Sequence, residues 1–347
     1  MKYIVAAAAM SMVMGLPSSA LADWKHEKSG ISIPDTIGEM KKGEVRDLSD
    51  GQENDVSVQY GAGPLAVTVY VYRASYPNPA LWFERTLIPM TTNVGMFKVN
   101  EPPRKLTIAG SPRENALRQS FDIDANVGVK WPSKSTAFVM GQVNEWIVKL
   151  RISSQTLDRA GVDQLMNQLL AAIHFDKLST DPLPLVVPES CTDAIETKGE
   201  PVKPKDAETL QAQGLAEGIV IYAEARGVES GVAREPDKWC KLKTSSPEQF
   251  VTTYREKTSG KFVSLVGDSG RSIASLGLVT SKLAKTALYV NDANATRLVW
   301  FFDDFPESAA ATLNSLPYLD GKKQGLGSLS FDPALAKAPA QSERKAP

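Results

Sequence analysis

Residues 135–175 decide the fold class, and they read STAFVMGQVNEWIVKLRISSQTLDRAGVDQLMNQLLAAIHF. The apolar runs at 135–141 and 145–152 are separated by a short turn, a pattern typical of two strands joined as an antiparallel hairpin. Farther along, apolar residues recur at spacings of three and four, which predicts an amphipathic helix over 162–175. Asp158 is a suitable N-terminal cap for this helix. A helix that lies across one face of an antiparallel sheet indicates an α+β fold.

The sequence before this stretch predicts more of the same sheet. Alternating apolar residues indicate strands at 31–34, 55–60 and 66–72. The strand at 66–72 is apolar or aromatic on both faces, so we expect it in the centre of the sheet. A helix is expected from Pro79, followed by strands near 105–108 and 115–121.

Composition excludes several classes of protein. The chain has 347 residues, with 39 Lys and Arg, 40 Asp and Glu and two His, for a net charge of −1. This balance lacks the basic excess typical of nucleic-acid-binding proteins. With 42% hydrophobic residues the chain can form a core, which excludes overall disorder. Because of this charge balance, we expect no nucleic acid partner. Since two His support few metal or catalytic sites, we also expect no metal and no cofactor.

The first 22 residues have the three parts of a secretory signal. These are Met1-Lys2, the apolar run 3–16 and a small-residue cleavage site at Ala20-Leu21-Ala22. As a helix, the apolar run would rise only about 21 Å, short of a hydrocarbon core about 30 Å thick. We therefore expect a signal peptide at 1–22 and a periplasmic or secreted protein of a Gram-negative bacterium.

The remaining chain divides into two bodies. The first spans 23–178 and the second 209–331. Between them, five prolines interrupt helices and central strands, which predicts a proline-rich linker at 179–208. The tail 332–347 has few bulky apolar residues, and we expect it to be disordered. Cys191 and Cys240 are an even count in a chain expected in an oxidising compartment, which favours a disulfide between them over a redox pair.

Several signals of the first body recur in the second in the same order. The tetrapeptide at 67–70 corresponds to Ile219-Val220-Ile221-Tyr222, the one at 79–82 to 236–239, and the one at 136–139 to 286–289. We expect each copy to end in a helix. The order predicts a tandem duplication with a groove where the two units meet. The alternative is that short apolar strands recur by chance.

The first body resembles the PsbP-like α/β sandwich. The resemblance is carried by Gly30-Ile31-Ser32-Ile33-Pro34 and by Trp146-Ile147-Val148-Lys149-Leu150-Arg151 leading into 162–175. The segment 67–86 also resembles exported bacterial proteins without an assigned activity. Both resemblances imply a non-enzymatic binding or assembly module, and neither supplies a catalytic residue.

Gly267-Asp268-Ser269-Gly270 is similar to the sequence around the nucleophile of chymotrypsin-like serine proteases. That chemistry needs a histidine base beside the serine, and the chain offers only His26 and His174. We expect this tetrapeptide to be a turn between two strands, and a serine hydrolase that uses Ser269 is the alternative.

Two further groups could form sites. Asp303-Asp304, with Asp292 and Asn294, could supply oxygen ligands to Ca²⁺, but a hairpin turn and a helix start explain them more simply. The stronger binding candidate combines aromatic side chains with arginine, the residue types that dominate recognition surfaces. Its members are Tyr70, Tyr72, Arg73, Tyr76, Trp82 and Arg85. The alternative is that these aromatic side chains pack in the core or on a sheet face.

The sequence as a whole favours a non-catalytic binding or assembly protein of the bacterial envelope. Its partner would be an envelope protein or a small ligand.

Overall fold

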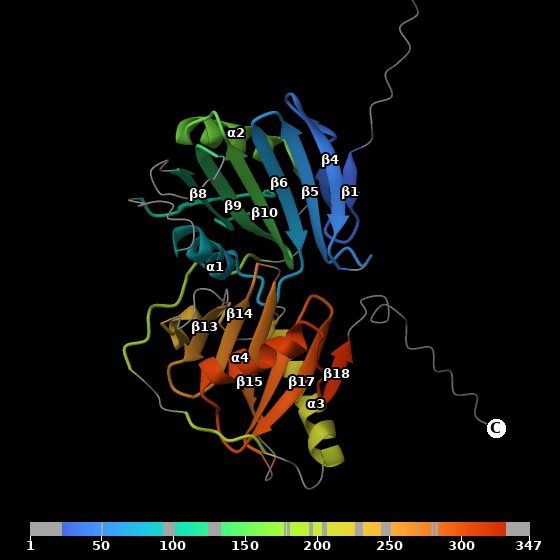
Figure 1. Ribbon diagram of the computed structural model, residues 1–347, viewed down its shortest axis with the longest axis vertical. Coiled ribbons are helices and arrows are strands. Elements are labelled where there is room, and N and C mark those ends of the chain that lie inside the picture. The colour runs from blue at the N-terminus through green and yellow to red at the C-terminus, as the bar shows by residue number, and fades with distance from the viewer. Residues whose placement is uncertain are drawn as a thin grey trace, which may run out of the picture.

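The computed structural model describes residues 23–49, 51–92, 101–123, 133–176, 178, 181–193, 197–202, 207–225, 232–243, 251–268, 270–278, 281 and 284–330. The predicted signal peptide, the predicted tail and Ser269 lie outside these residues. Figure 1 shows two bodies stacked along the long axis of the molecule, with the first above and the second below. Within the described residues the strands form three antiparallel sheets, which with the helices make a mixed fold compatible with α+β.

The first body contains a large sheet and a small one. Its strands are β1 (Trp24–His26), β2 (Ile31–Ile33), β3 (Thr36–Ile37), β4 (Met40–Asp47), β5 (Asp55–Ala62), β6 (Leu65–Tyr72), β7 (Arg104–Leu106), β8 (Ala116–Asp122), β9 (Ser135–Val143), β10 (Trp146–Ser154) and β11 (His174–Phe175). The large sheet has the order β3-β4-β5-β6-β10-β9-β8-β7, and β1, β2 and β11 form the small sheet.

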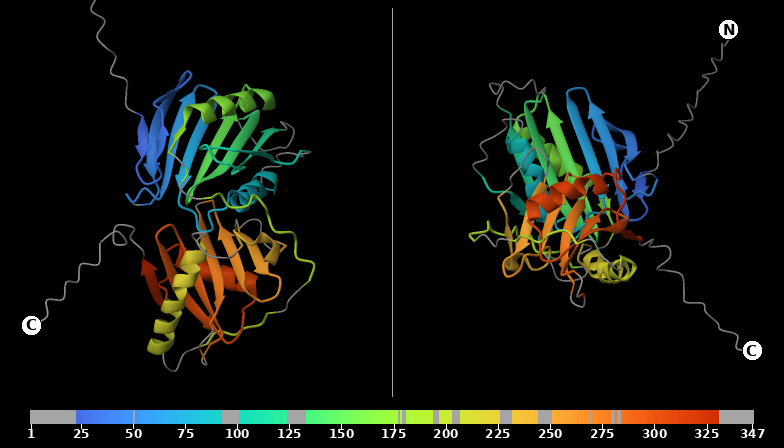
Figure 2. Two further views of the ribbon diagram at one scale, coloured as in Figure 1. Left: turned by 180° about the vertical axis from the view of Figure 1, so that it is seen from behind. Right: turned by 60° about the horizontal axis from the view of Figure 1, so that its bottom comes forward.

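Strand β10 occupies the centre of the large sheet. Leu150 lies opposite Val69 of β6 on one side and Val139 of β9 on the other. Helix α1 (Pro79–Thr92) connects β6 to the outer part of the sheet and contacts β8 and β9. Helix α2 (Arg159–Ala172) also packs on β8, β9 and β10, and Figure 2 shows it across the sheet seen from behind. The predicted cap is confirmed, since the Asp158 side chain accepts a hydrogen bond from Gly161 N at 2.8 Å.

The second body is a single meander. Its strands are β12 (Trp239–Lys241), β13 (Val251–Glu256), β14 (Phe262–Val266), β15 (Arg271–Gly277), β16 (Thr286–Asn291), β17 (Ala295–Phe302) and β18 (Gly327–Ser330), paired in chain order. A short 3₁₀ helix, η1 (Pro236–Lys238), precedes β12. Helix α3 (Ala207–Ala225) contacts β16, β17 and β18, whereas α4 (Ser308–Leu319) contacts β15 and β16. The two helices lie on opposite faces of this sheet, as a comparison of Figures 1 and 2 shows.

The repeat pairs residues 219–222 with the strand at 67–70, and this pairing is wrong because residues 219–222 lie inside α3. A short apolar run looks alike in a buried strand and in a helix, and here the flanking Ala, Glu, Gln and Leu residues continue the helix on its N-terminal side. Gly214 and Gly218 allow α3 to lie close to the sheet, since a side chain there would meet Phe301 or Tyr289.

The structure does not confirm the duplication. The two large sheets have different strand orders, because β10 inserts beside β6 in the first body whereas the second body has no such crossover in its described strands. One part of the expected correspondence holds. The hairpin β9–β10 precedes α2, and the hairpin β16–β17 precedes α4.

One hydrophobic core is shared by the two bodies. Its buried residues include Trp82 and Phe83 of α1, Ile221 of α3, and Trp239 and Tyr254 of the second sheet. We expected a groove where the two units meet. Where this core lies, apolar side chains from both bodies fill the junction instead. Separate cores lie beneath α2 and beneath α4.

The described parts of the predicted linker run along both bodies as a strap. Leu183 N donates to Gln142 of the first body at 2.8 Å, and Cys191 N donates to Lys241 O of the second at 2.9 Å. The predicted disulfide is confirmed, with Cys191 and Cys240 joined and their Cα atoms 4.8 Å apart. Among the described helices, none has the length and hydropathy needed to cross a membrane.

Removing the disulfide is expected to destabilise the fold by roughly 2 to 3 kcal/mol. Closing a loop of 49 positions gives an upper value of about 4 kcal/mol, and we expect less because an unfolded chain that retains some structure loses less entropy to the cross-link. Urea unfolding of a Cys191→Ala/Cys240→Ala variant measures the loss. A reductant should destabilise the wild type to a similar extent and leave the variant unchanged. Equal stability of the two proteins would contradict the expectation.

Candidate functional site

Most of the predicted binding residues lie at the junction between the bodies and are buried. Tyr72, Tyr76, Trp82 and Arg85 are each 2% exposed or less. Arg73 is also buried, at 9%, and Tyr70 is half-buried. The end of β6, the loop after it and helix α1 bring these side chains toward the second body.

The contacts of these residues are those of a packed core. Trp82 Nε1 donates to Tyr76 O at 3.1 Å, and the rings of Trp82 and Tyr72 meet edge to face at 6.4 Å. Arg73 pairs with Glu145 at 2.7 Å. The interpretation as packing residues thus accounts for their positions, and ligand binding by them stays a prediction that would require the bodies to separate.

The turn between β14 and β15 inserts polar groups into the junction. Asp268 accepts hydrogen bonds from Thr86 at 3.1 Å and from Lys149, a buried residue of β10. Gly270 has φ +75°, and a Cβ there would lie 2.6 Å from Ala74 Cα, so only glycine fits this approach without displacing backbone. The predicted turn is confirmed for its described residues. Within this turn, Asp268 makes the polar contacts to the first body. From the sequence alone we considered Ser269 and did not single out Asp268.

A second polar contact joins α1 to the sheet of the second body. Glu84 accepts a hydrogen bond from Tyr254 Oη at 2.9 Å and pairs with Lys241. Burial, and then the charge of Glu84, raises the pKa of Tyr254 well above its ordinary value, so this phenol stays protonated as a donor. Charged groups of the two bodies therefore neutralise one another across the junction.

Asp55, at the start of β5, is an acid of this region whose pKa is strongly raised. Burial, followed by the negative charges of Asp268 and Asp47, raises the pKa of Asp55 to about 6, against the opposing effect of Arg271 and Lys149. The ordinary value is 3.8. Near neutral pH the junction therefore holds Asp55 as a carboxylate in surroundings that favour its neutral form.

We expect Asp55→Asn to stabilise the protein at pH 7.5 by about 1 to 2 kcal/mol. The shift in pKa corresponds to at most about 3 kcal/mol, and water near this half-buried carboxyl reduces the effect. Because the folded pKa is raised, the penalty is absent below about pH 4, grows as the pH rises to about 6 and is constant above that.

The measurement is the difference in free energy of unfolding between Asp55→Asn and wild type from pH 4 to 8. Taking the difference cancels the opposite contribution of His26, whose pKa burial lowers. A difference that does not change with pH would contradict the raised pKa of Asp55.

The two histidines occupy structural positions. His26 Nδ1 is hydrogen-bonded to Ser29 at 2.6 Å and Nε2 lies 2.7 Å from Glu53 O. His174 is exposed on the short edge strand β11. Since Ser269 is outside the described residues, the hydrolase alternative stays a prediction.

The candidate Ca²⁺ residues make turn and strap contacts. Asp292 Oδ1 accepts from Asn294 N and Ala295 N, as in a hairpin turn, and Asp303 Oδ1 accepts from Glu200 N. Within the described parts of the chain, no three His, Cys, Asp or Glu residues gather as metal ligands would.

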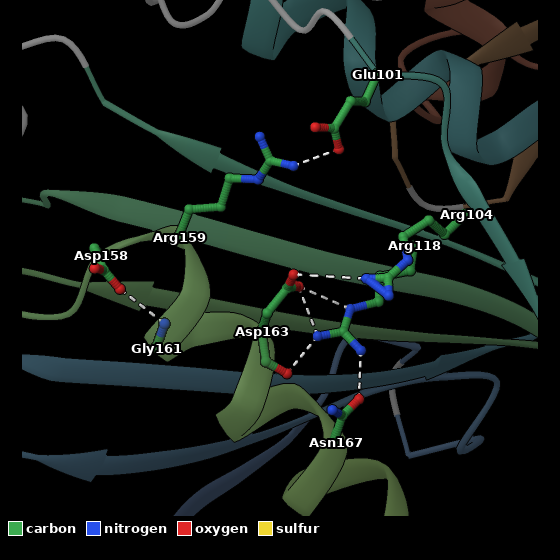
Figure 3. Close-up of polar contacts among 8 residues, drawn as sticks. All are labelled: Glu101, Arg104, Arg118, Asp158, Arg159, Gly161, Asp163 and Asn167. Atoms are coloured by element: carbon green, nitrogen blue, oxygen red, sulfur yellow. Dashed lines mark hydrogen bonds and ion pairs between the residues drawn. The ribbon is translucent and has the colours of Figure 1, made fainter.

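An ion-pair network fastens α2 to the outer strands of the first sheet (Figure 3). Arg118 of β8 donates from Nε to Asp163 at 3.0 Å, and from a terminal nitrogen to Asn167 at 2.5 Å. Arg159 pairs with Glu101 at 2.5 Å in a more exposed position. Because Asp163 and Asn167 lie one helical turn apart, one guanidinium fixes the rotation of α2 on the sheet.

The second body contains a cavity of about 910 Å³ on the α4 side of its sheet. Segment 197–201 of the strap forms one wall, held by Gly199 N donating to Phe305 O at 2.9 Å. Trp300 and Phe302 of β17 form another, and the first half of α4 a third. Charged side chains also line the cavity, and they are Lys198, Glu200, Arg255, Glu307 and Lys323. Sequence reasoning missed this site, because its walls come from segments that lie far apart in the sequence.

No family model, curated protein or solved structure matches the chain. The resemblances drawn from the sequence therefore remain expectations, and the geometry of the chain's own residues carries the functional argument.

Proposed function

We propose that the protein is an exported, non-catalytic binding protein of the bacterial envelope that holds a small ligand in the cavity of its second body. The single observation that carries this proposal is the cavity itself. Its volume of about 910 Å³ lies within the roughly 300 to 1,000 Å³ typical of sites for small molecules. Its walls combine aromatic surface with a few charged and polar groups, the usual composition of such sites.

Two further observations support binding in an exported protein. The start of the sequence has the three parts of a secretory signal, and the disulfide between Cys191 and Cys240 suits an oxidising compartment. The disulfide also fastens the strap shortly before it reaches the cavity wall at Thr197. Because the disulfide holds this wall on one side, the site is favoured to be preformed. A preformed site loses less conformational entropy when a ligand binds.

The test is native mass spectrometry of the protein isolated from the cell envelope after expression with its own N-terminus. We expect a mature chain that begins at Asp23 and a population that carries one bound small molecule. Ala310 is an exposed residue of the cavity wall, and Ala310→Trp places an indole side chain in the cavity. The population with a bound small molecule should therefore fall at least tenfold. Ala309→Trp is the matched control, since Ala309 adjoins this position but does not line the cavity.

A wild-type mass without any adduct, or an adduct that Ala310→Trp leaves unchanged, would overturn binding in this cavity. Covalent labelling of Ser269 by a fluorophosphonate would instead favour the hydrolase.

A further inference from the structure

We propose that the cavity binds an organic anion, a molecule with one acidic group such as a carboxylate or a phosphate on a flat apolar body. This inference rests on the proposed binding function and adds the charge and shape of the ligand.

The apolar body is inferred from the side chains that β17 and α4 contribute. Trp300 and Phe302 supply aromatic surface, while Ala310 and Ala311 are small and leave room beside it. Aromatic walls favour flat ligands because rings stack in offset or edge-to-face contact. The Trp300 ring is itself held edge to face against Tyr318 at 6.1 Å, which fixes its orientation.

The negative charge is inferred from the ionisable residues in the same walls. Lys198, Arg255 and Lys323 are cationic, and Glu200 and Glu307 are anionic. Glu307 is already committed, since it accepts hydrogen bonds from Ala309 N at 3.0 Å and Ala310 N at 2.6 Å as the N-terminal cap of α4.

Arg255 is committed as well, since it donates to Asp193 O at 2.6 Å. The lining as a whole carries three cations and two acids, and the positive end of α4 lies beside Glu307. A cationic ligand would face this excess directly. Lys323 Nζ lies 5.7 Å from the centre of the Tyr318 ring, and this contact steadies the ammonium group beside the cavity.

The experiment compares two probes that share one aromatic body and differ in a single acidic group. These are 1-anilinonaphthalene-8-sulfonate and its neutral parent N-phenyl-1-naphthylamine, titrated against the full chain by calorimetry and by probe fluorescence. We expect one site and binding of the sulfonate about tenfold tighter than that of the parent, with the difference reduced at high salt.

Two neighbouring lysines provide the matched variants. Lys323→Glu should weaken binding of the sulfonate about tenfold and leave binding of the parent within twofold. Lys322→Glu makes the same charge change at a residue outside the cavity lining, and we expect no change beyond twofold. Both positions are exposed, and thermal unfolding of each variant verifies that the fold is intact.

The possible results separate the two proposals. If both probes bind equally and neither responds to Lys323→Glu, but Ala310→Trp abolishes both, the ligand class is wrong and the binding function stands. If neither probe binds at the cavity, the ligand class is wrong, and the native mass spectrum alone decides the binding function. Tighter binding of the sulfonate that depends on Lys323 and not on Lys322 supports the inference.

Discussion

Trp82→Ala is expected to lower the free energy of unfolding by about 3 to 5 kcal/mol, the largest effect of any single change considered for this chain. The indole is fully buried in the core that both bodies share, and Tyr76 O accepts its N–H. Truncation removes this apolar area from the core, leaves a cavity and removes one of the two hydrogen bonds that Tyr76 O accepts, the other coming from Asn78 N. Urea unfolding followed by circular dichroism measures the loss.

Because the core is shared, we also expect the two bodies of the variant to unfold in one transition, as in the wild type. Ile219→Ala is the control, since Ile219 is also large and apolar but 53% exposed on α3, and its loss should change stability by less than about 0.5 kcal/mol. A loss below 1 kcal/mol for Trp82→Ala would show that the indole is not buried between the bodies.

Arg118→Met is expected to destabilise the protein by about 2 to 4 kcal/mol. Arg118 is buried and holds Asp163 with two of its nitrogens, so the substitution leaves a mostly buried carboxylate with only the exposed Arg104, at 3.9 Å, as its cationic partner. The value lies toward the lower part of the range for buried pairs because the Asp163 side chain is 24% exposed. Chemical unfolding provides the measurement.

Two variants from the same network test the cause. Arg159→Met breaks the exposed pair with Glu101 and should cost less than about 1 kcal/mol. Arg118→Met combined with Asp163→Leu removes both charges and should recover most of the stability. A double variant as unstable as Arg118→Met would indicate that the loss comes from packing rather than from the unpaired carboxylate.

The parts of the fold that sequence reasoning located correctly depend on local patterns. The spacing of apolar residues and the cap at Asp158 predicted α2, and the alternation on either side of a turn predicted β9 and β10. The pairing of Cys191 with Cys240 followed from their even number and the expected compartment. The signals for α2, β9 and β10 each lie within a short stretch of sequence. The disulfide was predictable because two cysteines allow one pairing.

The features that sequence reasoning missed depend on contacts between distant segments. The insertion of β10 beside β6 joins strands separated by an intervening helix and three strands, which no local pattern encodes. Residues 219–222 fit a strand as well as a helix, and they belong to α3 because the helix that begins at Ala207 continues through them. Asp268 pairs with Lys149 across 119 positions, so its importance appears only once the bodies are placed together.

The shared core also has a consequence for the order in which the chain is made. A ribosome completes the first body before Trp239 and Tyr254 exist, and at about 5 to 20 residues per second the rest follows roughly 10 to 30 s later. During this interval Trp82 lacks the apolar side chains of the second body that share its core. A holding chaperone therefore has a defined target on the nascent chain, and the first half produced alone should aggregate unless the second half is synthesised beside it.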